Sequence, residues 1–184
     1  PFLLGSAAGA GLGVTLVIVN DLNYSFGIIN SVQLGAFIGA LGAVICAAFI
    51  SISAGKSIAS LLLAGIATAA FLTACQTYLM HKNYSSMQEI YSWIIGRLLT
   101  SGWEDVITIL PYFTVCFIII FLFRKELDLL RLSEDEAKML GGNPRRTYFI
   151  VLTASSLLTA VAVSLSGLIA FVGLVIPHIL RLTV

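Results

Sequence analysis

The chain has 184 residues, of which 59% are hydrophobic and 10% are charged, and its formal net charge is +1. A soluble domain is usually about a quarter charged, so this sequence lacks the polar residues that a water-exposed surface needs. The small net charge is also not that of a basic nucleic-acid-binding protein. The composition therefore predicts an integral membrane protein that sits in a lipid bilayer and has no nucleic-acid partner.

The first two apolar runs, residues 1–20 and 31–53, each reach the roughly 20 residues that a membrane span requires. Both contain glycines four residues apart, which places these glycines on one face of a helix. Small residues on such a face allow a second helix to approach closely. We therefore predict helix-packing positions at Gly5, Gly9, Gly13, Gly35 and Gly39.

A third span is predicted at residues 57–80, and a more polar stretch follows at residues 81–105. Within this stretch, apolar residues recur at the spacing of an amphipathic helix on the membrane surface, namely Ile90, Trp93, Ile94, Ile95, Leu98 and Leu99. Trp93 and Trp103 are typical of the aromatic belt at a membrane boundary. A fourth span is predicted at residues 106–123, where Pro111 should kink or locally unwind the helix.

A charged segment, residues 124–146, follows the fourth span and holds six of the ten Lys/Arg and five of the nine Asp/Glu. Its excess of basic residues places it in the cytoplasm. Ser133 can cap a helix that Glu136 supports through a capping box and that Gly141 ends. We predict a short, rigid helix outside the bilayer that serves a soluble partner, with a solvated connector as the alternative.

Residues 147–180 contain no Lys, Arg, Asp or Glu. As one helix this run would be about 51 Å long, whereas the hydrocarbon core is only about 30 Å thick. We therefore predict a fifth span at residues 147–165, a break at Ser166-Gly167 or Gly173, and a shorter sixth segment ending at residues 177–181. A single, strongly tilted helix is the alternative. The predicted fold class is an all-α, polytopic membrane bundle with six transmembrane segments.

The distribution of charge also predicts the orientation. With the charged segment inside and six alternating spans, Lys56 and Arg181 also lie inside. Eight Lys/Arg are then cytoplasmic, and only Lys82 and Arg97 are outside. Both ends of the chain are consequently predicted on the cytoplasmic side.

Patterns that indicate catalysis are scarce. Residues 55–57, Gly-Lys-Ser, resemble the end of a phosphate-binding loop, but Ile50 stands where that motif requires Gly. His81 and His178 lie far apart and on opposite predicted membrane faces, and we interpret both as structural residues. The cysteines lie inside apolar runs, where they pack rather than bind metal: Cys46, Cys75 and Cys116. We predict no catalytic residue, metal site or bound cofactor.

No Asp, Glu, Lys or Arg lies in the middle of any predicted span. Ion-coupled transporters usually keep an ionisable group there, although sodium sites can also be built from backbone carbonyls. If the protein moves a solute uphill, its energy is therefore expected to enter through the charged segment. An ion-coupled secondary transporter, a polytopic membrane enzyme and a membrane protein without a transport role are the alternatives.

Five blocks of the sequence resemble, in order, the permease subunit of the FecCD-type ABC importers, which carry iron–siderophores, haem and cobalamin. They begin at Pro1, Ser60, Trp93, Ser133 and Ser166 and read PFLLGSAAGAGLG, SLLLAG, WIIG, SEDEAKMLG and SGLIAFVGLVIPHILRL. The last block is the most specific and holds the family-motif residues Gly173, Pro177, His178 and Arg181, although Ala170 replaces the family's glycine. The family's permeases have ten spans, so this resemblance implies a partial permease domain, residues 1–184, that corresponds to the third to eighth spans.

The resemblance also implies residue roles. The short helix resembles the coupling helix that contacts the ATPase subunit, here Glu134, Asp135, Glu136, Ala137, Lys138, Met139, Leu140 and Gly141. Ser57 and Ser60, at the start of the third span, resemble the cytoplasmic gate of a path that this span lines. Residues 81–103 would face the solute-binding protein, with Lys82 and Arg97 as candidate contacts.

The implied function is that of a non-catalytic permease subunit in the inner (cell) membrane. It would form the path for an iron chelate, such as a siderophore or haem, or for cobalamin. The implied partners are a second permease copy in a homodimer, two cytoplasmic ATPase subunits and an extracytoplasmic solute-binding protein. ATP hydrolysis would take place on the ATPase subunits.

Overall fold

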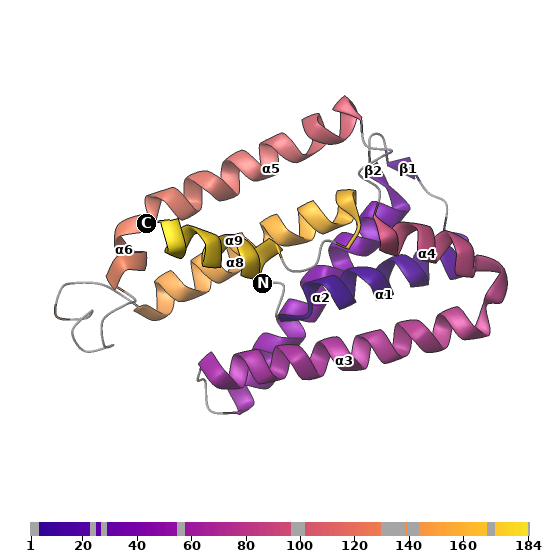
Figure 1. Cartoon of the computed structure of the whole chain (residues 1–184), viewed down its shortest axis with the longest axis horizontal. Helices are drawn as coiled ribbons and strands as arrows, with labels where there is room; N and C mark the ends of the chain where they lie inside the picture. The colour runs from indigo at the N-terminus through magenta and orange to yellow at the C-terminus, as the bar shows by residue number, and fades with distance from the viewer. Residues whose placement is uncertain are drawn as a thin grey trace.

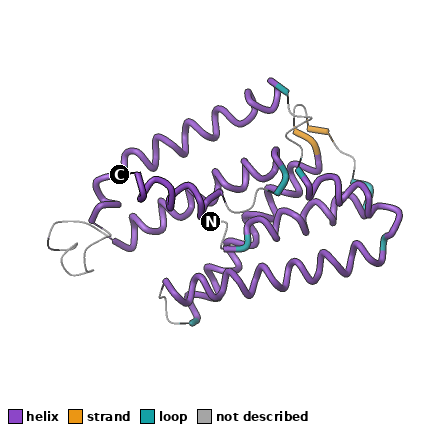
Figure 2. Tube along the Cα trace, in the orientation of Figure 1, coloured by secondary structure: helices purple, strands orange, loops and turns teal. Residues whose placement is uncertain are grey.

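The computed structural model describes residues 4–22, 25–26, 29–54, 58–96, 102–129, 139, 144–168 and 172–183. Helices dominate these ranges, and several of the long ones run roughly along the longest axis of the molecule (Figure 1). The two strands, β1 (Ser25–Phe26) and β2 (Ile29–Asn30), form a minimal antiparallel hairpin that appears in orange in Figure 2. The described part is thus a helical bundle, as the sequence predicted.

The helices follow the predicted elements closely. They are α1 (Ser6–Val19), α2 (Ser31–Ser53), α3 (Ile58–Lys82), the 3-10 turn η2 (Tyr84–Ser86), α4 (Met87–Ile95), α5 (Trp103–Leu122), α6 (Arg124–Leu129), α8 (Pro144–Ser166) and α9 (Val172–Thr183). The predicted second span coincides with α2. A capping interaction starts this helix, because the Gln33 side chain accepts a hydrogen bond from the Asn30 backbone N–H at 3.0 Å.

Four of the described helices are long and apolar enough to cross a membrane: α2, α3, α5 and α8. Helices α1 and α9 have 14 and 12 residues, fewer than the roughly 20 that a crossing requires. A helical membrane protein is therefore supported, but the described helices do not supply the six full-length spans that the sequence predicted.

The break predicted within the long uncharged run is confirmed. Helix α8 ends at Ser166, and Gly167 has a φ of +79°, which favours glycine because it has no Cβ. The chain then resumes as α9, whose C-terminal end lies on the same side of Figure 1 as α6. The alternative of a single tilted helix is wrong, and Gly173, the other predicted break point, lies inside α9.

Helix α5 stays helical through Pro111, so the predicted local unwinding is wrong. The start of the helix is capped by Asp105, whose carboxylate accepts a hydrogen bond from the Gly102 backbone N–H at 3.1 Å. One turn before Pro111, the Thr108 hydroxyl donates to the Glu104 carbonyl at 2.8 Å. These bonds hold the first turns together ahead of the proline, which cannot donate a backbone hydrogen bond.

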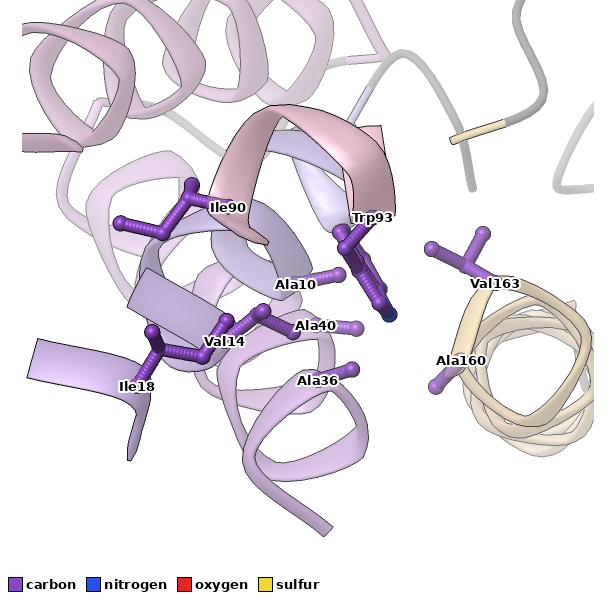
Figure 3. Packing of buried hydrophobic residues seen from close by; sticks show 9 residues of the cluster. All are labelled: Ala10, Val14, Ile18, Ala36, Ala40, Ile90, Trp93, Ala160 and Val163. Carbon is purple, nitrogen blue, oxygen red and sulfur yellow. The ribbon is translucent and has the colours of Figure 1, made fainter. Parts of the chain in front are cut away.

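The principal hydrophobic core lies where four helices meet (Figure 3). It contains Ala10, Val14 and Ile18 of α1, Ala36 and Ala40 of α2, Ile90 and Trp93 of α4, and Ala160 and Val163 of α8. Trp93 is only 3% exposed, so its predicted place in an aromatic belt is wrong, whereas Trp103 is 82% exposed. The apolar face of α4 packs on protein, and small alanines leave room for the indole ring.

Candidate functional site

Four of the five predicted packing glycines meet between α1 and α2. A Cβ added to Gly9 would lie 2.2 Å from the Gly39 carbonyl oxygen, and one added to Gly13 would lie 2.0 Å from the Gly35 carbonyl oxygen. No real Cβ approaches a backbone atom so closely, so only glycine allows the two backbones to touch. Gly5 instead has a φ of +82° and faces α3, where a Cβ would lie 3.3 Å from backbone atoms.

A second close contact joins α4 to the end of α8. Gly96 ends α4 with a φ of +114°, and a Cβ added to Gly167 would lie 2.6 Å from the Trp93 carbonyl oxygen. The sequence blocks that begin at Trp93 and Ser166 therefore meet through their backbones. Sequence reasoning did not connect them, although the glycine in each block was a signal of close approach.

A cavity of about 930 Å³ lies along α3. It is lined by Gly5, Ala7 and Ala8 of α1, Ile66, Ala69, Thr73, Gln76, Thr77, Met80 and His81 of α3, Met87, Tyr91, Ile94 and Ile95 of α4, and Leu168. The described residues of this lining include hydroxyl, amide and imidazole groups but no Asp, Glu, Lys or Arg. Such a wall suits a solute that passes without forming an ion pair.

Gln76 is a polar residue of this wall that sequence reasoning missed. It is 6% exposed, and its Nε2 atom has no hydrogen-bond partner among the described residues. Its amide lies over Gly11, where a Cβ would stand 2.7 Å from Oε1. The glycine therefore makes the space that this amide occupies between α1 and α3.

Of the two predicted gate residues, only Ser60 is described. Ser57 is outside the described residues, and Ser60 does not line the cavity. The Ser60 hydroxyl oxygen is 3.1 Å from that of Ser51, so this pair links the end of α2 to the start of α3.

The predicted coupling helix lies outside the described residues except for Met139, which is helical and 88% exposed. The predicted coupling-helix residues outside the described ranges are Glu134, Asp135, Glu136, Ala137, Lys138, Leu140 and Gly141. Both ends of the charged segment are described, however. Helix α6 is its first part, α8 begins within its last part at Pro144, and the Thr147 hydroxyl of α8 donates a hydrogen bond to the Glu126 carboxylate of α6.

These elements form a glycine-packed body, a charge-free cavity beside it and a charged connection at one end. The model of the FecCD transport family matches residues 1–184. The chain belongs to the FecCD transport family.

Curated FecCD relatives resemble the chain over all or nearly all of its residues. The uncharacterised ABC transporter permease protein YvrB of Bacillus subtilis is 34% identical over 99% of this chain and 52% of its own length. The cobalamin import system permease protein BtuC of Halobacterium salinarum is 33% identical over 100% and 49%. Other relatives are named for iron chelatin, hemin and molybdate transport. The chain spans about half the length of these relatives.

A solved structure supports the same fold. It is a metal-chelate type ABC transporter in an inward-facing conformation, which matches with a TM-score of 0.84 at 28% sequence identity. The match covers 98% of this chain and 56% of that chain. The helical arrangement is therefore that of part of a FecCD-type membrane transporter.

The family-motif residues lie on α9. Gly173 and Pro177 are within this helix, and the side chains of His178 and Arg181 are exposed. His178 does not join His81, which lines the cavity at the end of α3. Within the described ranges, no group of three His, Cys, Asp or Glu side chains could hold a metal ion.

Proposed function

We propose that the chain forms part of the solute path of an ABC importer, as its membrane permease subunit, and that a separate subunit hydrolyses ATP. The observation that carries this proposal is the match to the FecCD family over residues 1–184. The described spans agree with it, because four helices are apolar enough to cross a bilayer. The chain itself is not an enzyme in this proposal and binds no cofactor.

The cavity along α3 is the candidate for part of the path. Its uncharged wall suits a large chelate whose metal is already enclosed, since such a solute needs shape and a few hydrogen bonds rather than metal ligands. The glycine contacts between α1 and α2 would keep the neighbouring wall rigid while other parts move. Ser57 and Ser60 remain the proposed gate at the cytoplasmic end.

Charge at the two ends of the bundle supports the proposed orientation. One end of the bundle, which would face the cytoplasm, carries basic residues from three helices: Arg124 and Lys125 of α6, Arg146 of α8 and Arg181 of α9. The opposite end carries most of the acidic residues of the described helices. We propose six crossings, with α1 and α9 as parts of two of them, and both ends of the chain on the cytoplasmic side of the cell (inner) membrane.

The proposed assembly contains a second permease copy as a homodimer, two ATPase subunits and a solute-binding protein. Residues 124–146 would be the cytoplasmic loop that receives the ATPase, through the predicted coupling helix at residues 134–141. The opposite end, with Lys82 and α4, would face the solute-binding protein. The whole of residues 1–184 would act as one permease domain.

The proposed substrate is an iron chelate, either a siderophore or haem, or cobalamin. Relatives named for iron chelatin, hemin and cobalamin transport support this class. Another relative is named for molybdate import, so an oxyanion is the alternative substrate class to test. Uptake measured with an iron–siderophore, haem, cobalamin and molybdate therefore separates these classes in one experiment.

The test of the proposed function uses the full-length permease reconstituted in lipid vesicles with its ATPase and binding protein. Glu136→Arg and Leu140→Trp should lower ATP-driven uptake and ATPase association about tenfold or more, because both change the predicted contact with the ATPase. Asp128→Arg makes the same charge change on α6, outside the predicted coupling helix, and should leave uptake within about twofold. Uptake without any ATPase, or unchanged uptake in both coupling variants, would contradict the proposal.

A further inference from the structure

The short helix α6 is attached to the end of α5 in two ways. The Leu127 backbone N–H donates to the Phe123 carbonyl at 2.9 Å, which joins the first turn of α6 to the preceding turn. The Arg124 guanidinium carbon lies 4.5 Å from the centre of the Phe121 ring, a cation–π contact. Because the backbone and a side chain both span the junction, α6 should move with α5.

A third contact attaches α6 to α8. The Thr147 hydroxyl donates a hydrogen bond to the Glu126 carboxylate, and Thr147 is only 1% exposed. A hydrogen bond to a charged acceptor is stronger than a neutral one, and this bond is part-buried, with its donor inside the protein and Glu126 half-buried. Figure 1 shows α6 at the end of the bundle where α8 begins.

These contacts lie at the two ends of the charged segment. The chain leaves α6 after Leu129 and returns at Pro144, three residues before Thr147. The Glu126–Thr147 hydrogen bond therefore joins the outgoing and returning ends at the base of the segment. Helices α5 and α8 also pack directly on one another, and this bond adds a connection between them at the base of the segment, where a displacement of the segment would act.

We propose that Glu126 and Thr147 are positioning residues for coupling, because their hydrogen bond makes α5 and α8 move as one unit when the ATPase displaces the charged segment. This inference rests on the proposed function. It assigns to these two residues no contact with solute or nucleotide. Their effect is on how much uptake each hydrolysed ATP produces.

The test compares variants of the full-length permease in the reconstituted system described above. Glu126→Ala and Thr147→Val remove the hydrogen bond, while Glu126→Gln and Thr147→Ser keep an acceptor and a donor. Solute uptake and ATP hydrolysis are measured together, so that their ratio reports coupling. Asp128→Ala, which removes an exposed carboxylate from the same helix, is the matched control.

Glu126→Ala and Thr147→Val should each lower uptake per ATP about threefold to tenfold, while complex assembly and basal ATP hydrolysis stay unchanged. In Glu126→Gln, Thr147→Ser and Asp128→Ala, uptake per ATP should stay within about twofold of the unaltered protein. The double variant Glu126→Ala/Thr147→Val should lose no more uptake per ATP than the more affected of its two single variants, because both remove the same bond. A merely structural role would instead lower assembly and basal hydrolysis along with uptake.

Two results would overturn the inference while leaving the proposed function intact. One is an unchanged uptake-to-ATP ratio in Glu126→Ala, and the other is an equal loss in Glu126→Gln and Glu126→Ala. If the unaltered assembly shows no ATP-driven uptake of any tested solute, the proposed function itself fails, and the inference fails with it.

Discussion

Helices α2 and α5 are equally apolar, yet they pack very differently. In the most apolar 18-residue window of each helix, 33% of α2 residues are buried, against 6% in α5. Helix α2 meets α1 through glycines, whereas α5 presents a ladder of aromatic rings, in which Phe117 lies 5.8 Å from Phe113 and 6.1 Å from Phe121 between centroids.

This difference shows that hydrophobicity alone does not select the packed face of a membrane helix. Lipid tails are as apolar as leucine, so burying an apolar side chain against another helix gains little over leaving it in lipid. Close backbone approach does provide additional van der Waals contact, and glycine permits it. Bulky side chains, as on α5, instead keep neighbouring backbones apart.

The largest effect is expected from adding one methyl group at the glycine contact. Gly39→Ala would place a Cβ 2.1 Å from the Gly9 carbonyl oxygen, and this overpacking should cost about 3 kcal/mol or more of folding free energy. Unfolding midpoints and size-exclusion profiles of the purified protein measure the loss. Gly42→Ala is the matched control on the same helix, since its Cβ would meet nothing within 4 Å.

Gly42→Ala should therefore change stability by less than about 1 kcal/mol, and in the favourable direction, because alanine is the better helix former. Equal losses in the two variants would mean that the α1–α2 contact is not what makes α2 more buried than α5.

An intermediate effect is expected at the α4–α8 contact. Gly167→Ala would strain a φ of +79° and bring a Cβ to 2.6 Å from the Trp93 carbonyl oxygen. We expect a loss of about 2 kcal/mol, because the left-handed conformation alone disfavours a Cβ by about 1–2 kcal/mol. Gly102→Ala, at an open position without positive φ, should lose less than about 1 kcal/mol in the same unfolding measurement. An unchanged unfolding free energy in Gly167→Ala would mean that the close α4–α8 contact does not stabilise the fold as the α1–α2 contact does.

The smallest effect is expected on α5. Phe117 is 53% exposed, so Phe117→Leu should change the unfolding free energy by less than about 0.5 kcal/mol. Phe117→Trp provides a direct probe, since brominated lipids should quench the added indole fluorescence if lipid covers this face. Absence of quenching, or a loss above about 2 kcal/mol, would show that protein covers the α5 ladder in the assembled transporter.

Trp93 illustrates where sequence reasoning reached its limit. The spacing of Ile90, Trp93 and Ile94 correctly indicated one apolar face, and Ile90 is fully buried. The pattern contains no information on whether lipid or protein covers that face, and protein covers it here. Ile95, assigned to the same face, is 75% exposed, because a residue five positions after Ile90 lies on a different face of the helix.

The Glu126–Thr147 contact was also beyond the sequence. These residues lie 21 positions apart, and neither belongs to a motif that pairs them. In the sequence, residues 124–146 form one charged segment, and only the position of α6 against α8 reveals that its two ends are joined. The coupling helix itself stays a prediction, since only Met139 of it is described.

The sequence by itself determined the membrane class, the approximate extent of the long helices, the glycine face and the break at Gly167. These features depend on composition and on backbone preferences over a few neighbouring residues, which the sequence contains directly. Only the tertiary structure decided that Gly9 meets Gly39 and that Gly5 faces α3 instead. The physical reason is that contacts between distant residues depend on the positions and crossing angles of whole helices, which are set by all of their packing interactions together.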